Sequence, residues 1–262
     1  STMRKRTSLY KNNQALKKWR KKAFRMWKKH IRGAFFTQSV FLITDRKNHI
    51  YNRRNVVKWR KRKSAENGET ADLEKEETNM YFGVQMYGVS KEWKQDPEGF
   101  LKKIYEAGYR QIEPCLGFRV DARDYGFWIP EDLEQAMPLL AKYHIEVHAV
   151  HIFLDEYHYE RELAILTELA QKYHISWFVV KSPARLTKDV LDETAARYRE
   201  LAEELEKAGA GLLIHNEKED ICIRVNGKTA YEYLLEACGE KVGAEVDAGW
   251  MYCGGVDPEE FL

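Results

Sequence analysis

Short apolar, β-branched runs recur along the chain from about residue 80 onward, with amphipathic stretches between them. The runs centre near Val84, Ile112, Val147, Val179, Leu213 and Ala244. The intervening stretches place apolar residues on single helical faces, and Leu133, Leu163 and Leu191 each begin one such face. Strands and helices that alternate at about 30 residues per unit predict a parallel sheet with right-handed crossovers.

Both an open doubly wound sheet and a barrel fit this alternation, but the Gly-rich phosphate loop of the open sheet is missing. Gly83 and Gly88 do not form a GxGxxG motif after the first run. The segments 96–98 and 257–259, both Asp-Pro-Glu, predict helix starts with a capping Asp before a Pro. The sequence therefore predicts an α/β fold of the TIM (β/α)8 type, with about six βα units in residues 80–262.

A barrel of this type has eight units in roughly 250 residues, so we expect two further strands beyond residue 262. Six strands of a barrel have two edges with unpaired backbone N–H and C=O groups. We expect self-association through these edges, unless residues 35–44 cover one of them. Their sequence, FFTQSVFLIT, is the only strand-like stretch that precedes residue 64.

Charge divides the chain into two unlike parts. Residues 1–63 hold 22 of the 43 Lys and Arg residues and one acid, Asp45. Residues 64–79 are acidic and almost free of large apolar side chains, which is the composition of a linker. We expect a basic extension over 1–63, disordered or partly helical, then an acidic linker over 64–79 and a globular domain over 80–262. Contact of the extension with nucleic acid or an anionic membrane is a less favoured interpretation.

The cysteine pattern and the hydropathy limit the compartment. Cys115, Cys222, Cys238 and Cys253 form no CxxC pair, which argues against a structural zinc site and a disulfide framework. No apolar run reaches the roughly 20 residues that span a bilayer. We therefore expect a cytoplasmic protein.

Polar side chains end or follow each predicted strand, where barrel enzymes keep their active sites. They are Gln85, Glu113, His148, His151, Lys181, His215, Asn216, Glu217, Glu245 and Asp247. His, Glu and Asp residues that converge on one barrel mouth suit a divalent metal such as Mn²⁺, Mg²⁺ or Co²⁺. We assign catalytic roles to Glu113, His151, Lys181 and Glu217, and substrate contacts to Gln85 and Asn216.

Structural interpretations stay open for some of these residues. Glu113 could pair with Arg110 or Arg119 instead of serving a site. His148 could be a packed core histidine. Glu219 competes with Glu217 for a single role.

Several segments resemble the sugar phosphate isomerase/epimerase family of xylose isomerase-like barrels. GAEVDAGWMYCGGVDPEEFL (243–262) is similar to the sixth-strand segment of that family, and GLLIHNEKED (211–220) to its fifth. MYFGVQMYGV (80–89), GYRQIEPC (108–115) and EVHAVHIFL (146–154) resemble its first three strands. In the family, acidic or His residues that end strands five to eight hold the metal. The resemblance therefore implies a metal held weakly by His215 and Asp247, and substrate binding by Trp250, which stands where some relatives have His.

The resemblance implies a metal-dependent isomerase or epimerase of a small sugar, sugar phosphate or polyol ketone. The metal would polarise a carbonyl and the adjacent hydroxyl, and a carboxylate or His would move a proton at the neighbouring carbon through an enediolate. Two alternatives stay open: a non-catalytic barrel remnant, and an endonuclease IV-like enzyme acting on abasic DNA.

Overall fold

The computed structural model describes residues 40–44, 51–52, 55–56, 80–154 and 158–257, with side chains described from residue 83 onward. All six predicted strand positions carry β-structure. These positions form a row of parallel strands. The strands of the row are β4 (Met80–Gln85), β5 (Gln111–Glu113), β6 (Cys115–Leu116), β7 (Glu146–Val147), β8 (Ala149–Ile152), β9 (Trp177–Lys181), β10 (Gly211–His215) and β13 (Val242–Glu245). The shorter strands outside it are β1 (Val40–Thr44), β2 (Tyr51–Asn52), β3 (Asn55–Val56), β11 (Arg224–Val225) and β12 (Lys228–Thr229).

Helices occupy the predicted amphipathic stretches. They are α2 (Ser90–Gln95), α3 (Pro97–Glu106), α4 (Pro130–Lys142), α5 (Tyr159–Tyr173), α6 (Lys188–Lys207), α7 (Lys218–Cys222), α8 (Ala230–Cys238) and α9 (Ala248–Cys253). Short 3-10 helices are η1 (Tyr87–Val89), η2 (Val120–Tyr125) and η4 (Gly239–Lys241). The predicted cap at Asp96 is confirmed, because its carboxylate accepts a hydrogen bond of 2.9 Å from the Gly99 N–H. The second predicted helix start, at residues 257–259, extends outside the described residues.

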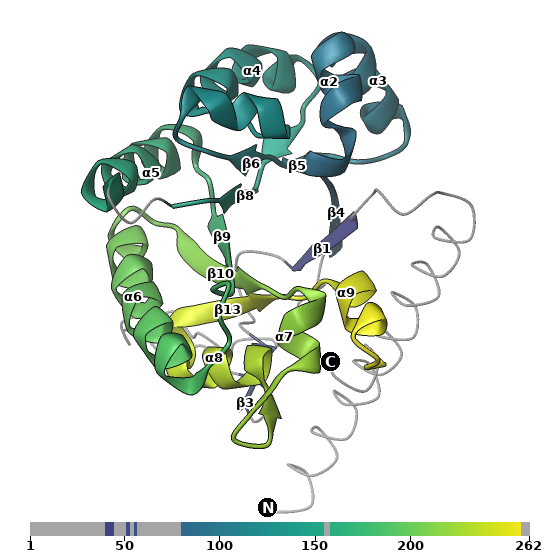
Figure 1. Ribbon diagram of the computed structural model, residues 1–262. Coiled ribbons are helices and arrows are strands. Elements are labelled where there is room, and N and C mark those ends of the chain that lie inside the picture. Colours follow the sequence, from purple (N-terminus) through teal and green to yellow (C-terminus); the bar gives the residue numbers. More distant parts are fainter. Residues whose placement is uncertain (1–39, 45–50, 53–54, 57–79, 155–157, 258–262) are drawn as a thin grey trace, which may run out of the picture.

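The row of parallel strands consists of two sheets, β4-β5-β7 and β6-β8-β9-β10-β13, which follow one another along a curve (Figure 1). β4 pairs with β5 and β5 with β7, while β6 pairs with β8, β8 with β9, β9 with β10 and β10 with β13, all in parallel. The second and third strands are each split in two, at Pro114 and at His148. Pro114 has no N–H to donate, but its carbonyl accepts from the His151 N–H at 2.9 Å, so the two strands stay in register.

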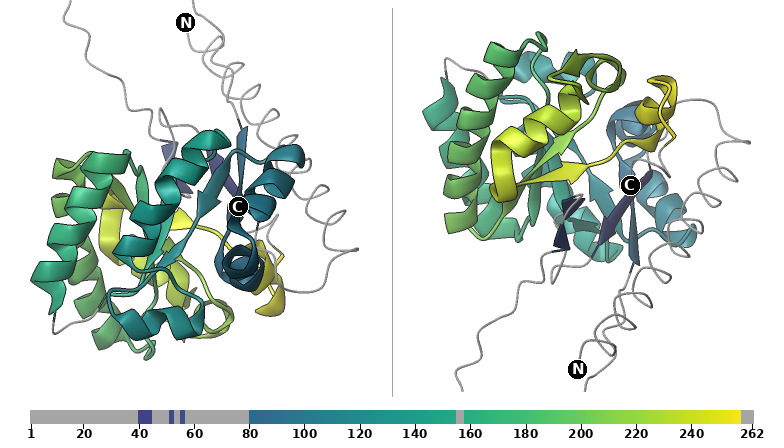
Figure 2. Two further views of the ribbon diagram at one scale, coloured as in Figure 1. Left: turned by 90° about the horizontal axis from the view of Figure 1, so that it is seen from above. Right: turned by 90° about the horizontal axis from the view of Figure 1, so that it is seen from below.

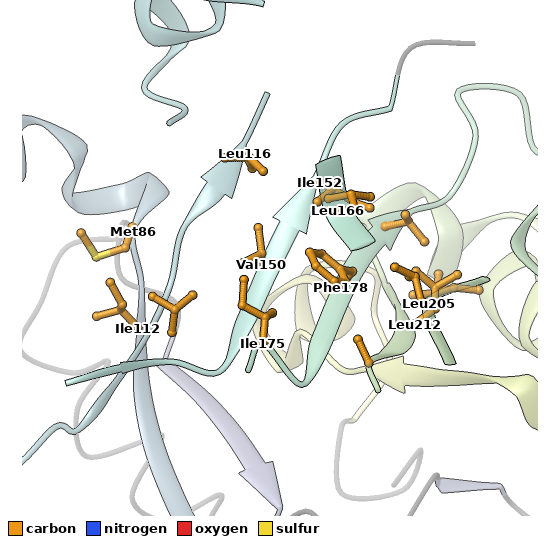
Figure 3. Packing of buried hydrophobic residues seen from close by; sticks show 14 of the residues in the cluster. Met86, Ile112, Leu116, Val150, Ile152, Leu166, Ile175, Phe178, Leu205 and Leu212 are labelled. Carbon is orange, nitrogen blue, oxygen red and sulfur yellow. The ribbon is translucent and has the colours of Figure 1, made fainter. Parts of the chain in front are cut away.

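The helices α4, α5, α6 and α8 lie on the outer side of the strand row (Figures 1 and 2). Apolar side chains of the strands meet those of the helices there, with Val150, Phe178 and Leu212 packed near Leu166 and Leu205 (Figure 3). All five are essentially inaccessible to solvent. Strands buried by helices in this way read as continuous apolar runs, which explains why the sequence pattern located them.

One edge of the row carries an antiparallel strand from the basic extension. β1 pairs with β4 from Val40↔Val84 to Thr44↔Met80, and it comes from the segment 35–44 that the sequence singled out as an edge cover. Most of the extension and the linker over 64–79 lie outside the described residues. Within the described part of the chain, no helix is long and apolar enough to cross a membrane.

Candidate functional site

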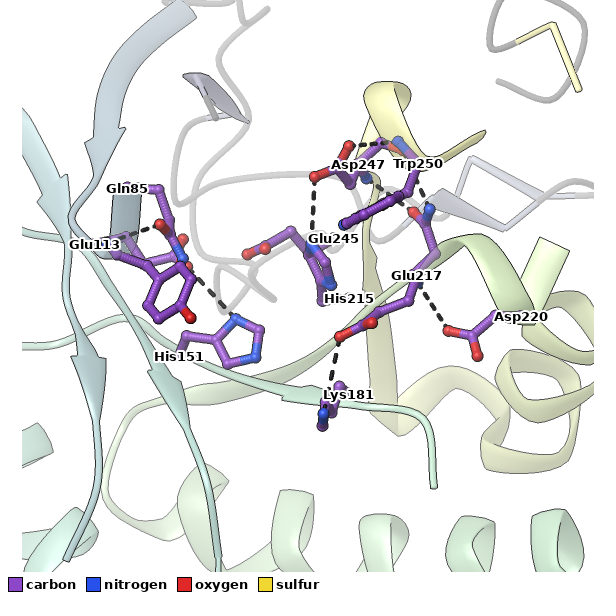
Figure 4. A network of polar contacts seen from close by, with 12 residues as sticks. Gln85, Glu113, His151, Lys181, His215, Glu217, Asp220, Glu245, Asp247 and Trp250 are labelled. Carbon is purple, nitrogen blue, oxygen red and sulfur yellow. Dashed lines mark hydrogen bonds and ion pairs between the residues drawn. The ribbon is translucent and has the colours of Figure 1, made fainter. Parts of the chain in front are cut away.

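Acidic and histidine side chains gather at the carboxyl ends of the strands, as expected for a barrel mouth. Glu113 ends β5, His151 lies in β8, His215 ends β10 and Glu245 ends β13. Figure 4 shows Glu113 and His151 on one side, facing His215 and Glu245 on the other. All four side chains are buried. The site is therefore a polar cluster inside a protein interior, a placement that is costly unless the groups are paired or bind a ligand.

Glu113, His151 and Glu245 form the inner cluster. One possible ligand atom from each lies within 4.8 Å of the other two. His151 Nδ1 is 3.8 Å from Glu113 Oε1, which is beyond hydrogen-bond length. The three residues come from the second, third and sixth strands of the row, so the curvature of the sheet brings them together.

Burial sets the charge of the inner cluster. It raises the pKa of Glu113 to about 8, although the neighbouring Glu245 carboxyl offsets part of the rise. Burial, together with the charge on Glu113, also raises the pKa of Glu245 well above its usual value. Burial, with the nearby cations His215 and Lys181, lowers the pKa of His151 to about 3, so its imidazole is neutral.

When both carboxyl groups are ionised, several atoms of the inner cluster have no hydrogen-bond partner among the described residues. They are both carboxylate oxygens of Glu113, both ring nitrogens of His151 and Oε1 of Glu245. A proton on either carboxyl would let Glu113 and Glu245 bond each other. Buried polar atoms are almost always satisfied in folded proteins, so a group of unsatisfied ones indicates a missing ligand. Two carboxylates and a neutral imidazole are the donor set that Mn²⁺, Mg²⁺ or Co²⁺ accepts. The inner cluster therefore fits a divalent cation.

His215 and Asp247 form an adjacent pair. His215 Nε2 lies 3.5 Å from Asp247 Oδ2, and the His215 ring stands edge-on to that of His151 with centroids 5.4 Å apart. Burial opposes a proton on His215, but the hydrogen bond to Asp247 and the charges of Glu245, Asp247 and Glu217 outweigh it and raise the pKa. The two metal ligands implied by the family resemblance thus contact each other and border the inner cluster.

Lys181 and Glu217 lie nearer the solvent. Lys181 Nζ is 3.9 Å from Glu217 Oε1, and both side chains are about half exposed. The Glu217 backbone N–H donates to the Asp220 carboxylate at 2.8 Å, which fixes the start of α7. Glu219 is exposed on α7 and does not take part in this pair, so the structure brings Glu217, and not Glu219, beside Lys181.

Two of the predicted substrate contacts are engaged within the protein. The Gln85 amide donates to Cys115 Sγ at 3.1 Å, and its oxygen accepts from the Tyr87 N–H at 2.9 Å. Asn216 is fully buried, and its amide bonds both the N–H and the C=O of Asp247, at 2.8 and 3.1 Å. The third, Trp250, is 41% exposed on α9 near Asp247.

The sequence left Glu245 without a role, although it listed the residue at the end of the sixth strand. The only sequence feature that pointed to Glu245 was its spacing of two from Asp247, which places both side chains on one face of the predicted strand. That spacing did not reveal how close Glu245 lies to Glu113. The alternative pairing of Glu113 with arginine is wrong. Arg110 donates to the carbonyls of Tyr105 and Tyr109, and Arg119 pairs with Asp121.

Comparisons with known proteins bear on the fold. No family model and no curated protein matches the sequence. A sugar phosphate isomerase/epimerase from Parabacteroides distasonis aligns with a TM-score of 0.55 at 22% identity, covering 68% of this chain and 69% of that one. A probable 3-DHS dehydratase involved in petrobactin synthesis, from Bacillus anthracis, aligns with a TM-score of 0.45 at 16% identity. The alignment covers 61% of this chain and 60% of that one.

A xylose isomerase-like TIM barrel protein from Mycobacterium smegmatis in complex with magnesium aligns with a TM-score of 0.38 at 16% identity. The alignment covers 59% of this chain and 56% of that one. This chain thus spans less than two thirds of the length of the second and third proteins. The first alignment confirms, at the level of the fold, what the sequence predicted. The chain has a parallel α/β fold of the TIM-barrel type, shared with a sugar phosphate isomerase/epimerase.

Proposed function

We propose that the protein is a metal-dependent isomerase or epimerase of a small sugar, sugar phosphate or polyol ketone. One observation carries the proposal. Glu113, His151 and Glu245 meet in a buried cluster at the strand ends, with ligand atoms that no described residue satisfies. Titratable groups that are desolvated together at a barrel mouth are typical of an enzyme site.

Glu113, His151 and Glu245 would hold the divalent ion, whose charge would compensate the two buried carboxylates. When bound, such an ion polarises a substrate carbonyl and the adjacent hydroxyl. This assignment differs from the one implied by the resemblance, in which His215 and Asp247 hold the ion. Variants of that pair distinguish the two metal sites.

His215 is the group that we propose moves a proton. Asp247 lies against its Nε2 and stabilises the protonated form, while Nδ1 has no hydrogen-bond partner among the described residues. An imidazole with one nitrogen held by a carboxylate and the other available can accept or donate a proton at a carbon next to a carbonyl. Such a transfer through an enediolate would isomerise or epimerise the substrate.

Lys181 and Glu217 would contact substrate hydroxyl groups at the solvent side of the mouth. Their ion pair is long and half exposed, so a substrate can replace it at little cost. Trp250 offers an exposed ring in the same region.

Two linked measurements test this function. Mn²⁺ binding is measured by titration calorimetry, and solvent deuterium incorporation into a panel of ketoses and ketose phosphates by NMR. We expect Glu113→Gln and Glu245→Gln to weaken Mn²⁺ binding at least tenfold and to abolish deuterium incorporation. Glu162→Gln is the matched control, since Glu162 is equally buried but lies on α5.

Unchanged Mn²⁺ affinity in both cluster variants would remove the ion from this site. A larger loss in His215→Ala and Asp247→Asn than in the cluster variants would return it to the pair implied by the resemblance. Metal binding without deuterium incorporation would favour the non-catalytic barrel. Cleavage of abasic DNA would favour the nuclease.

A further inference from the structure

His151 is held in the inner cluster without a hydrogen bond. Neither ring nitrogen has a partner among the described residues, although the side chain is only 7% exposed. A histidine that ligates a metal usually donates its other N–H to a carboxylate or carbonyl, which fixes the plane of the ring. Some other contact must therefore orient this imidazole.

An aromatic stack provides that contact. Phe153 lies two residues after His151, so strand alternation places both side chains on one face. Their rings are 5.1 Å apart at an interplanar angle of 20°. Phe153 also stacks on Phe127, with ring centroids 4.4 Å apart and an interplanar angle of 15°. Three rings thus lie nearly parallel, and the imidazole plane follows theirs.

Backbone contacts anchor the far end of the stack. Phe127 follows Gly126, whose φ of 87° turns the chain back after η2. The Phe127 N–H donates to the Ala122 carbonyl at 3.2 Å, and the Trp128 N–H to the Cys115 carbonyl at 2.8 Å. The Phe127 ring is therefore attached to the strand next to β8, and it can support Phe153 against rotation.

We propose that Phe153, supported by Phe127, is a positioning residue that holds His151 for a divalent cation in place of the usual hydrogen bond. The proposal rests on the proposed function in taking a cation as the ligand of the cluster. Stacking fixes the ring plane and leaves both nitrogens unpaired, so His151 can ligate through either one.

The test is metal binding by the full chain, independent of turnover. Mn²⁺ affinity is measured by calorimetry, and the visible absorption of bound Co²⁺ reports the ligand geometry. We expect Phe153→Leu to weaken Mn²⁺ binding by about tenfold, the usual effect of losing a partner that orients a ligand, and to shift the Co²⁺ bands. Phe153→Tyr keeps the ring and should retain both properties.

Phe100→Leu is the matched control, because Phe100 is a buried phenylalanine of α3 that packs edge-on against Trp93 away from the cluster. An unchanged affinity in Phe153→Leu, or an equal loss in Phe100→Leu, would overturn the inference. If Phe153→Leu does not fold, Phe127→Leu removes the supporting ring instead and should weaken binding by about threefold; no loss there would also overturn it. His151→Ala separates the two proposals: if it leaves Mn²⁺ binding intact, the metal site of the proposed function fails as well.

Discussion

At the scale of single residues, the site is defined by how burial changes ordinary side chains. Glu113 and Glu245 would be ionised on a surface at neutral pH, but here burial raises the pKa of both, and the charge of Glu113 adds to the rise at Glu245. His151 is affected in the opposite direction and stays neutral. The cluster without metal therefore carries less charge than its composition implies, and a divalent ion must displace protons when it binds.

The raised pKa of Glu113 predicts how stability depends on pH in the metal-free protein. Its folded pKa of about 8 exceeds the ordinary value of 4.5, so its stabilising contribution is complete below about pH 4.5 and is lost as the pH rises through about 8. Between about pH 6.5 and 8, we expect the free energy of unfolding to fall by about 1 to 2 kcal/mol through this group. Denaturant titrations with a chelator present measure it.

Glu113→Gln should remove that part of the pH dependence, since the amide is neutral throughout. Glu245 and His215 also have raised pKa values and change stability in the same direction, so the difference between wild type and variant is the quantity to compare. An identical slope in both proteins would show that Glu113 is ionised in the folded state.

The sequence could predict some of these residues and not others. Glu113, His151, His215 and Asp247 were recognisable because polar residues at the ends of apolar strands are unusual. Glu245 was equally visible, but its partnership with Glu113 joins the second strand to the sixth. No local pattern encodes that distance, which depends on how the whole sheet curves.

At the scale of elements, the junction of β10 and β13 holds the ends of both strands in register. The Tyr231 hydroxyl, fully buried on α8, lies 2.8 Å from the Ile214 carbonyl and 3.1 Å from that of Glu245. Asn216 continues the pairing beyond the strands by bonding the Asp247 backbone at both its N–H and C=O. From the sequence we predicted that Asn216 contacts substrate. In the structure its side-chain amide donates and accepts hydrogen bonds as a backbone peptide group does within a sheet. That substrate role stays a prediction.

Tyr231→Phe tests this junction. Removing the hydroxyl takes a donor from one of the two buried carbonyl groups, which costs about 1 to 3 kcal/mol. We expect the free energy of unfolding to fall by that amount, and Mn²⁺ affinity to fall as well, because Glu245 and His215 lie at the ends of the two strands. Tyr125→Phe, at a tyrosine that is 69% exposed, should change neither. A stability loss without any change in Mn²⁺ affinity would limit Tyr231 to a structural role.

Element types and their order followed from the sequence, because buried parallel strands read as apolar runs and the helices as amphipathic stretches. The breaks within the second and third strands could not be predicted from the sequence. The break at Pro114 divides one strand into β5 and β6, and the break at His148 divides the next into β7 and β8. Proline signals a possible break, but the sequence has no such signal at His148, whose carbonyl accepts from the Ser176 and Trp177 N–H groups at 3.1 and 3.2 Å.

At the scale of the whole molecule, the parallel row has one edge at β4, where β1 pairs with it antiparallel. β1 is an extra antiparallel strand at the edge of an otherwise parallel sheet. The alternation of strands and helices along the sequence does not predict such a strand. Only the strand-like composition of residues 35–44 indicated that this segment could cover an edge. Open strand edges invite pairing with other chains, so the self-association that we predicted through the β4 edge depends on whether β1 stays in place.

The double variant Phe41→Pro/Leu42→Pro tests the role of β1. Proline has no N–H, and consecutive residues of an antiparallel strand donate alternately toward and away from the partner, so one of the two substitutions must remove a hydrogen bond to β4. We expect faster amide hydrogen exchange across β4 and concentration-dependent association in sedimentation velocity. Phe41→Ala/Leu42→Ala keeps both N–H groups and is the control for the loss of the side chains. Unchanged exchange at β4 in the proline variant would show that β1 does not protect this edge in solution.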